Sequence, residues 1–479
     1  MTQAARDIDQ IIRTEDAIIV PRRRGNKSIE VDDALMEDIR ELAHDKAGPM
    51  LLNILADLHA ADIAEIIDRL EPADQAYVFG LLDLPTGSSV LLELLPEVRG
   101  ALLESLPSEK ITLYVDLLAS DDAADLVAEL PPHVAEKVLR AMPAKDSSAV
   151  QRLMQYPEDT AGGIMAAEYV AVPMNSTVKQ AIKVVRTSAK KHQLIYNVYV
   201  IDEEGVLVGM LPLQSLVLHA PNKRVYKIME SDAKSVSTDV DQEQVAAMFR
   251  KYDLVSLPVV DKMGRLVGRI TIDDIVDVIE QEHSEDVARL VGSDAEELER
   301  RSPYQIAVLR LPWVLTTLAI EFGAGVVIHF YDTTLSRVIL LASFMPIISA
   351  ISGNTGLQSA AIIVRAMSTG HVTLDRWWHP VLRQMQTTLI IGAACALVIG
   401  IVGGIWQGKW PFGLVVGIAM FVSVNLSGLV GTTVPMISKH MGFDPALTAG
   451  PFETAFQDVV GISIFLSFAT LMLKWIAVP

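Results

Sequence analysis

Cysteine is almost absent from this chain of 479 residues, and basic residues are outnumbered by acidic ones. The single cysteine, Cys395, cannot form an intrachain disulfide and excludes a metal cluster held by several thiolates. With 40 Lys and Arg against 59 Asp and Glu, the chain lacks the basic footprint that a polyphosphate needs, so we expect no nucleic-acid partner. The first fifty residues hold no apolar core segment, so we expect no signal peptide there.

Charge is distributed unevenly along the chain, which is long enough for two or three domains. From Ser302 onward there are eight Lys or Arg and six Asp or Glu, whereas the preceding part holds 32 basic and 53 acidic residues. An acidic half beside an apolar half excludes a uniformly soluble globule.

The apolar half contains five runs long enough to cross a lipid bilayer, which takes about 20 apolar residues. Arginines cluster before the first run and in the loop between the second and the third. Basic residues mark the cytoplasmic side, so we expect a multi-pass protein of the plasma (inner) membrane with its acidic half in the cytoplasm and its C-terminus outside. The expected spans cover 306–330, 335–365, 384–406, 411–435 and 448–474.

The fifth span carries a carboxylate on a stripe of small residues. Gly450, Thr454 and Asp458 lie at successive steps of four, and Gly461 continues the stripe one turn later. Polar groups at membrane depth are costly and are usually functional. A cation site on Asp458 is the interpretation we favour, and an ion pair with a basic residue is the alternative. No Lys or Arg lies in the middle of any span to form that pair.

Other polar residues of the spans are open to two interpretations. Glu453 is either a mouth residue or an interfacial one, and Glu321 is either functional or a structural hydrogen-bonding group, which we slightly favour. The second span holds Pro346 and a Gly- and Asn-rich run, a pattern that predicts a broken or kinked helix facing a cavity or another helix. The fourth span offers a polar stripe that fits a pore face and a packing face equally well: Asn425, Gly428, Thr432 and Pro435. Oxygen ligands without His or Cys suit Mg²⁺, Ca²⁺ or Mn²⁺. In a homodimer, the commonest assembly, two Asp458 side chains across the two-fold axis and lined by small residues favour hydrated Mg²⁺ over dehydrated Ca²⁺.

The acidic half begins with a short period. Leu-Pro or Met-Pro pairs recur at steps of 11 or 12 residues, and each proline starts a short helix with apolar residues on its inner face. Short helices at a constant period predict a helical-repeat solenoid over residues 50–155.

A duplicated module follows the repeat. Val198–Gly209 parallels Leu257–Gly268, and each segment predicts a strand, an Asp…Gly hairpin turn and a second strand, preceded by a helical segment. This is the pattern of paired CBS domains, which we place at 160–222 and 223–286. CBS pairs often bind adenine nucleotides with the help of an Asp after the second strand. The first copy has Pro212-Leu-Gln-Ser215 there, which argues against a nucleotide in that copy.

Acidic residues are densest around the second copy, next to the membrane half. Like charges so close repel each other unless cations neutralise them, so we favour divalent-cation sensing over an ordinary solubilising surface. The acids concerned are Asp241, Glu243, Asp253, Asp274, Asp277, Glu282, Glu285 and Asp286.

A helical repeat, a CBS pair, a connecting helix and five spans, in this order, resemble the MgtE family of magnesium channels. The most specific segments are Gly353–Gln358 and Asp444–Gly461, and Glu453 departs from the usual pattern. The resemblance implies a homodimer in a lipid bilayer, with Asp458 holding hydrated Mg²⁺ assisted by main-chain oxygens of Thr454 and Gly461. We add Asn354 of the first segment to the candidate ligands. The eight acids around the second CBS copy correspond to the family's intracellular Mg²⁺ sites.

The fold class is therefore multidomain: an all-α solenoid, an α/β CBS pair and an all-α five-helix transmembrane bundle. Residues 1–49 are a possibly flexible extension, 287–305 a connecting (plug) helix and 306–479 the pore domain. The expected function is Mg²⁺ uptake down the electrochemical gradient, closed by intracellular Mg²⁺. The alternatives are a CBS-regulated secondary transporter of Mn²⁺ or Co²⁺ and a membrane-anchored regulator without transport. The sequence has no phosphate loop, nucleophile elbow or His-rich metal site, so we expect no enzyme.

Overall fold

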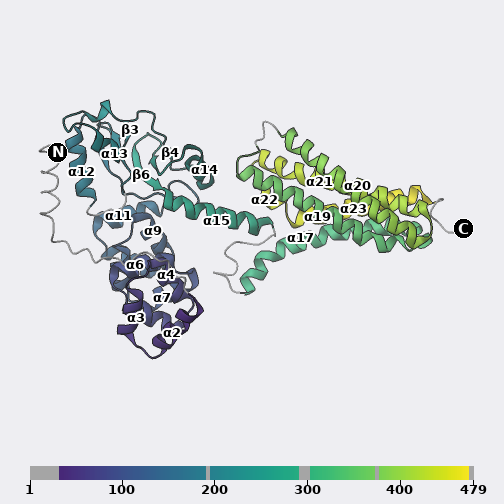
Figure 1. The fold of residues 1–479 in the computed structure, drawn as a ribbon, viewed down its shortest axis with the longest axis horizontal. Coiled ribbons are helices and arrows are strands. Elements are labelled where there is room, and N and C mark those ends of the chain that lie inside the picture. The colour runs from purple at the N-terminus through teal and green to yellow at the C-terminus, as the bar shows by residue number, and fades with distance from the viewer. Residues whose placement is uncertain (1–31, 190–194, 291–302, 373–376, 474–479) are drawn as a thin grey trace, which may run out of the picture. The chain divides into compact units, whose positions relative to one another are not determined.

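The structure, a computed structural model, describes residues 32–189, 195–290, 303–372 and 377–473. The chain divides into two compact units, which meet in the sequence between Gln155 and Tyr156. The first unit is helical, and the second contains both β-sheets and the long apolar helices (Figure 1).

The first unit is a series of short helices whose starts follow the prolines. Pro85 and Pro96 lie in the first turns of their helices, and Pro107, Pro131 and Pro143 are N-cap residues. Proline suits these positions because the first helical N–H groups have no intrahelical acceptor. The predicted helical repeat is confirmed, and its helices are α2 (Asp33–His44), α3 (Gly48–Leu55), α4 (Ala60–Asp68), α5 (Pro72–Leu81), α6 (Leu84–Glu93), α7 (Pro96–Ser105), α8 (Ser108–Val115), α9 (Ser120–Ala128), α10 (Pro132–Ala141) and α11 (Ala144–Leu153).

The repeat begins earlier than its period predicts. Helix α2 falls in the segment that the sequence assigned to a possibly flexible extension, yet it buries Met36, Ile39 and Ala43. The Asp32 side chain accepts a hydrogen bond from Leu35 N at 2.8 Å and so caps the helix. The extension therefore includes an ordered helix, while residues 1–31 lie outside the described part of the chain.

Two similar three-stranded sheets open the second unit. In each sheet the first strand pairs parallel with the second, and the second pairs antiparallel with the third. The first sheet contains β1 (Ala171–Pro173), β2 (Asn197–Ile201) and β3 (Leu207–Pro212), with helices α12 (Val178–Ser188) and α13 (Leu213–Leu218) and the 3₁₀ turn η1 (Val225–Lys227). The second contains β4 (Val236–Ser237), β5 (Ser256–Val260) and β6 (Leu266–Thr271), with helices α14 (Gln242–Tyr252) and α15 (Ile272–Leu290).

The two hairpins use the same turn chemistry, as the duplicated sequence predicts. The Asp202 side chain accepts hydrogen bonds from two backbone N–H groups of its turn, and Asp261 does the same in the second copy. Gly205 and Gly264 have φ of +84° and +77°, which favours glycine. The hairpins also bond each other, because Leu266 N donates to Gly205 O at 3.1 Å.

Among the residues that the structure describes, the membrane half contains five helices long and apolar enough to cross a bilayer, in agreement with the prediction. The spans are α17 (Pro303–Phe330), α19 (Leu341–Ser368), α20 (Trp378–Gln407), α21 (Trp410–His440) and α23 (Pro451–Leu471). Two short helices lie between spans, α18 (Asp332–Arg337) and α22 (Pro445–Thr448). These short helices explain why the second span starts at Leu341 rather than at 335 and the fifth at Pro451 rather than at 448. Within the predicted connecting helix 287–305, residues 291–302 lie outside the described residues.

The predicted break in the second span is wrong, since α19 is continuous through Pro346 and the Gly- and Asn-rich run. The Ser352 and Thr355 hydroxyls donate to the carbonyls of the residues four positions earlier, at 2.7 and 2.8 Å. These two hydroxyls are thereby satisfied within the helix, whereas Asn354 and Gln358 of the same run are exposed. The glycines of the run provide close packing instead, because a Cβ on Gly431 of α21 would overlap the backbone of Gly356.

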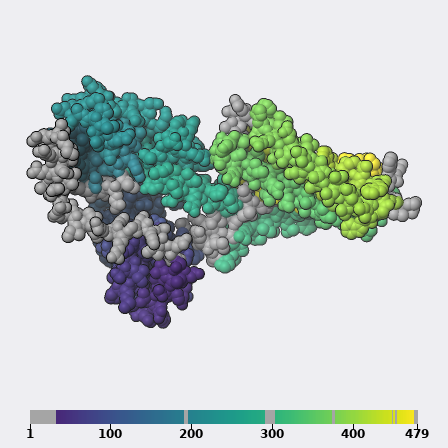
Figure 2. Space-filling model, in the orientation of Figure 1, coloured from purple at the N-terminus to yellow at the C-terminus, as the bar shows by residue number. Residues whose placement is uncertain are grey.

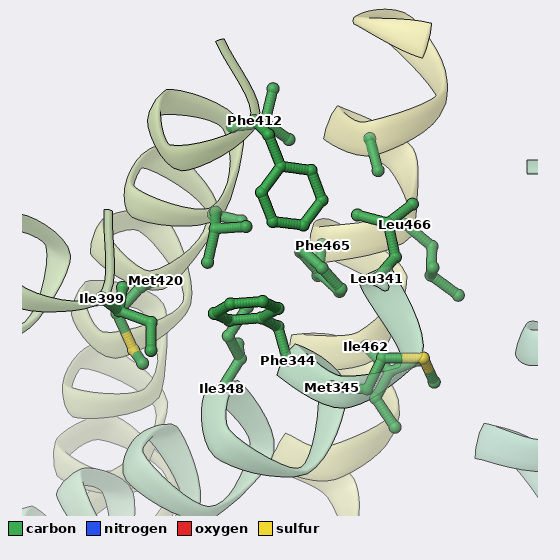
Figure 3. Close-up of a cluster of buried hydrophobic side chains, with 14 of the residues drawn as sticks. Leu341, Phe344, Met345, Ile348, Ile399, Phe412, Met420, Ile462, Phe465 and Leu466 are labelled. Atoms are coloured by element: carbon green, nitrogen blue, oxygen red, sulfur yellow. The ribbon is translucent and has the colours of Figure 1, made fainter. Parts of the chain in front are cut away.

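An aromatic cluster holds α19, α21 and α23 together. Phe344, Phe412 and Phe465 are fully buried and point toward one another (Figure 3). The ring centroids of Phe344 and Phe412 lie 5.5 Å apart in an edge-to-face arrangement. This cluster fixes the relative positions of the helices that carry the candidate ion site.

We predict that Phe344→Ala lowers the free energy of unfolding by about 3–5 kcal/mol, because it leaves a cavity in this cluster. Thermal unfolding of the full chain in detergent measures the loss. Phe330→Ala is the matched control, since that ring is 78 % exposed. Equal unfolding temperatures for the two variants would contradict the role of the cluster.

Candidate functional site

The candidate ion site lies where α23 packs against α19. A Cβ on Gly353 of α19 would stand 3.5 Å from the Thr454 side chain and 3.7 Å from Oδ1 of Asp458. One turn further along, a Cβ on Gly461 would contact Ser423 Oγ at 3.0 Å and Ser352 Oγ at 3.2 Å. Small residues therefore surround the carboxylate, as the sequence pattern predicts.

Asp458 is half-buried and is surrounded by oxygen rather than nitrogen groups. Ser349 of α19 donates its hydroxyl to Oδ1 of Asp458, and the Glu321 side chain of α17 shares a hydrogen bond with the same carboxyl group. None of the ion pairs among the described residues involves Asp458. The alternative of an ion pair with a basic residue thus receives no support, and Ser349 and Glu321 join the site.

Glu453 lies in the first turn of α23 and is buried against α19. Its side chain is 1 % exposed, as is that of Gln457, which donates Nε2 to Glu453 Oε1 at 3.1 Å. A Cβ on Gly356 of α19 would overlap this carboxyl group. The other oxygen, Oε2, is buried without a hydrogen-bond partner among the described residues. Glu453 is therefore held tightly between α23 and α19, one turn from Asp458.

Asn354 follows Gly353 on α19, and its role as a ligand stays a prediction. Its side chain is exposed, and the hydrogen bonds that reach Asp458 come from Ser349 and Glu321 instead. The fourth-span stripe is a packing face, because Asn425 accepts from Thr388 Oγ1 of α20 at 3.2 Å. A Cβ on Gly428 would overlap the same Thr388 side chain.

Acidic residues of the second CBS copy gather between α14 and α15, near the start of α22. Glu282 accepts a hydrogen bond from Gln242 Nε2 at 2.7 Å, and Asp241 caps α14 by accepting from Glu243 N at 2.8 Å. Burial raises the pKa of the Glu243 carboxyl group, and the negative charges of Glu282, Asp241 and Asp286 raise it further. Burial likewise raises the pKa of Asp286, and Asp444 and Glu282 add to the effect.

Two basic side chains enter this acidic region, and sequence reasoning assigned neither of them a role. Lys439 lowers the pKa of both Glu243 and Asp286 against the effect of burial. Arg289 forms ion pairs with Glu285 on its own helix and with Asp444 at the N-cap of α22. The i, i+4 spacing of Glu285 and Arg289 on α15 is the signal that could have predicted the first of these pairs.

The other acids predicted to sense Mg²⁺ are Asp253, Asp274 and Asp277. Asp253 ends α14 in a left-handed conformation with φ of +51°. Asp274 accepts from Thr271 N and Oγ1 at 3.0 and 2.9 Å, and its burial raises its pKa. Burial also raises the pKa of Asp277, and the charges of Glu280 and Asp273 add to it. Within the described ranges, no three Asp, Glu, His or Cys side chains are arranged to hold a metal ion.

Comparison with known proteins matches the helical repeat, the CBS pair and most of the membrane half. Residues 345–468 match a family model described as the MgtE divalent cation transporter, 58–159 match the MgtE intracellular N domain, and 161–221 and 225–281 match CBS domains. The magnesium transporter MgtE of Bacillus subtilis is 32 % identical over 444 residues, which is 90 % of this chain and 98 % of that protein. The magnesium transporter MgtE of Thermus thermophilus is 32 % identical over 450 residues, 93 % of this chain and 100 % of that protein.

Two of the similar solved structures are of the cytosolic or soluble part of a magnesium channel or transporter. A crystal structure of the cytosolic domain of the Mg²⁺ channel MgtE in complex with ATP covers 51 % of this chain and 99 % of that chain, at 34 % identity and a TM-score of 0.49. Enzymes match only the CBS pair: an inosine-5′-monophosphate dehydrogenase of Aquifex aeolicus is 33 % identical over 111 residues, 22 % of each protein.

The basic side chain in the acidic region generates a pH-dependent prediction. A carboxyl group whose folded-state pKa is raised favours folding at low pH and opposes it as the pH rises through that pKa. The positive charge of Lys439 lowers the pKa of Glu243 and of Asp286 and so reduces this loss of stability at higher pH. We therefore expect Lys439→Gln to lose about 1 kcal/mol of stability at neutral pH and little near pH 4.5, because half-exposed charge pairs contribute no more than that.

Unfolding temperatures of the full chain in detergent, at both pH values, measure the difference. Lys227→Gln in η1 is the control for loss of one positive charge. A loss that is equal at both pH values would contradict the electrostatic role of Lys439.

Proposed function

The chain belongs to the MgtE family of magnesium transporters, and on this premise we propose that it conducts Mg²⁺ across the membrane, down the electrochemical gradient, along a path that passes Asp458. The observation that carries the proposal is a carboxyl group at membrane depth that has hydroxyl and carboxyl neighbours but no ion pair among the described residues. Ionisable residues at this depth usually mark ion pathways.

The surroundings of Asp458 suit a hydrated ion. Mg²⁺ gives up its water reluctantly and is commonly bound through one or two carboxylates with several waters retained. Gly353, Thr454 and Gly461 offer little bulk beside the carboxylate, and the Ser349 hydroxyl orients one of its oxygens. We propose that Asp458 accepts hydrogen bonds from the waters of the ion, with the Thr454 and Gly461 carbonyl oxygens nearby on the same helix.

Closure by intracellular Mg²⁺ is the regulation that the acidic region supports. Burial and mutual repulsion both make the ionised forms of Glu243 and Asp286 costly, as their raised pKa values express. A divalent cation between them relieves both costs. Mg²⁺ closes the path only if it binds the closed state more tightly than the open one, and the Arg289–Asp444 contact between α15 and α22 is one route that links the two regions.

We further propose that two copies of the chain form the pore in the plasma (inner) membrane. Glu321, Asn354 and Gln358 are exposed on spanning helices, where contact with lipid would be costly. A second copy or a water-filled path would cover them, and two-fold symmetry is the commonest assembly. With five spans and a cytoplasmic CBS pair, we propose that the C-terminus lies outside.

Adenine nucleotide is a further ligand that a CBS pair suggests. Leu213 and Gln214 follow β3, whereas Asp273 and Asp274 follow β6. Asp274 is engaged with Thr271, and Asp273 is exposed. We therefore propose that only the second CBS copy binds the ribose of an adenine nucleotide.

For the conduction path, we predict that Asp458→Asn reduces Mg²⁺ uptake into proteoliposomes to the background of empty vesicles, because the amide keeps the size of the side chain but loses its charge. A fluorescent Mg²⁺ indicator inside the vesicles measures uptake with an imposed membrane potential. Asp332→Asn, at the exposed start of α18, is the matched control. Equal uptake by both variants would move the path away from Asp458, and a requirement for a counter-ion gradient would favour a secondary transporter.

For the regulation, we predict that Glu243→Gln combined with Asp286→Asn keeps conduction but raises the Mg²⁺ concentration needed for closure about tenfold, which corresponds to about 1.4 kcal/mol. The measurement is uptake as a function of Mg²⁺ on the cytoplasmic face. Glu203→Gln with Glu204→Gln removes two charges from the first hairpin and serves as the control. An unchanged closing concentration would exclude these acids from Mg²⁺ sensing.

A further inference from the structure

Helix α17 carries one acidic residue, Glu321, well inside its membrane-spanning length. The helix is otherwise apolar around this point, and large apolar side chains beside it are exposed, including Phe322 at 70 %. The side chain of Glu321 is exposed as well. A carboxyl group in this position is costly in contact with lipid, so its presence calls for a polar environment or a ligand.

The packing of α17 on α23 brings Glu321 to the candidate ion site. A Cβ on Gly323 of α17 would lie 3.7 Å from Val459 of α23, which shows how closely the helices approach. The carboxyl group of Glu321 is close enough to that of Asp458 for the two to interact directly. Two carboxyl groups from different helices therefore meet, and such a pair repels unless a shared proton or a cation neutralises it.

A third carboxyl group, that of Glu453, adds to the negative charge near Asp458. Glu453 is close enough to Asp458 for their charges to interact, and its Oε2 is buried without a hydrogen-bond partner among the described residues. Within the described residues, Glu321, Glu453 and Asp458 form no ion pair. The surroundings of Asp458 therefore carry a surplus of acidic groups, which a divalent cation offsets better than a monovalent one.

A hydrogen bond that merely joins α17 to α23 would not require a carboxyl group. A glutamine at position 321 could donate its amide to Asp458 and keep the two helices together without like-charge repulsion. The acid is exposed whereas its partner is half-buried, so the pair opens toward the surface of the single chain. Figure 2 shows this membrane part as the green-to-yellow surface, to which the exposed face of α17 contributes.

We propose that Glu321 is a second carboxyl group of the ion path and that it sets the preference for divalent over monovalent cations. The inference rests on the proposed passage of Mg²⁺ beside Asp458. In this arrangement one face of the hydrated ion donates hydrogen bonds from its waters to Asp458 and Glu321 of the same chain. Many cation channels gain selectivity from a ring of acidic side chains that lines the pore.

The test is Glu321→Gln in proteoliposomes of the full-length protein, with Mg²⁺ and K⁺ uptake measured in the same preparation. We expect Mg²⁺ uptake to persist with an apparent affinity about tenfold weaker, and the ratio of Mg²⁺ to K⁺ uptake to fall about tenfold, because one of two charges is lost. Glu321→Asp, which keeps the charge on a shorter side chain, should restore most of the ratio. Asp332→Asn is the control for loss of an acid elsewhere in the membrane half.

Unchanged affinity and ratio in Glu321→Gln, together with a lower unfolding temperature in Glu321→Ala, would overturn the inference and leave Glu321 as a helix-joining residue. Asp458→Asn in the same series separates this failure from that of the proposed function. If Asp458→Asn abolishes Mg²⁺ uptake while Glu321→Gln is unchanged, only the role of Glu321 is wrong. If Asp458→Asn conducts normally, the path lies elsewhere and both proposals fail.

Discussion

The membrane half is organised around the cost of keeping the Asp458 carboxyl group at membrane depth. A carboxylate there needs polar neighbours. Helix α19 supplies the Ser349 hydroxyl, and α17 supplies Glu321. These contacts require the helix backbones to approach closely. The Gly356–Gly431 approach allows α19 and α21 to come together, and Gly353 leaves room beside Asp458. The aromatic cluster of Phe344, Phe412 and Phe465 then fixes this arrangement from the far end of the same helices.

The cytoplasmic part of the second unit faces the same electrostatic problem under milder conditions. Desolvation and neighbouring acids raise the pKa values of Glu243, which is exposed, and of Asp286, which is partly buried, and Lys439 only partly offsets this effect. Water and mobile ions can reach such groups. In the proposed function, the acid at membrane depth selects the ion, and the acids at the water-exposed surface respond to its concentration. Arg289 joins the two regions through its ion pairs with Glu285 and Asp444.

Periodic and local features of the sequence were predicted well because they depend on neighbouring residues. The helix starts at Pro85 and Pro96 follow from the missing N–H of proline, and the paired hairpins follow from the Asp and Gly residues of their turns. Element ends were predicted less well. Helix α2 has no proline in its first turn that would predict its start. The short helices α18 and α22 lie in segments whose hydropathy is continuous with that of the neighbouring spans.

By itself the sequence determined the order of modules, the five spans and the placement of Asp458 on a stripe of small residues, because each depends on spacing along one chain. Tertiary structure decided which groups meet. The polar run of α19 predicts a break in isolation, yet its hydroxyls bond back to the helix and its glycines receive α21, so the helix continues. The partnership of Glu321 with Asp458 joins residues 137 positions apart, and that of Arg289 with Asp444 joins residues 155 positions apart. Contacts between such distant segments depend on how helices pack, which no local pattern encodes.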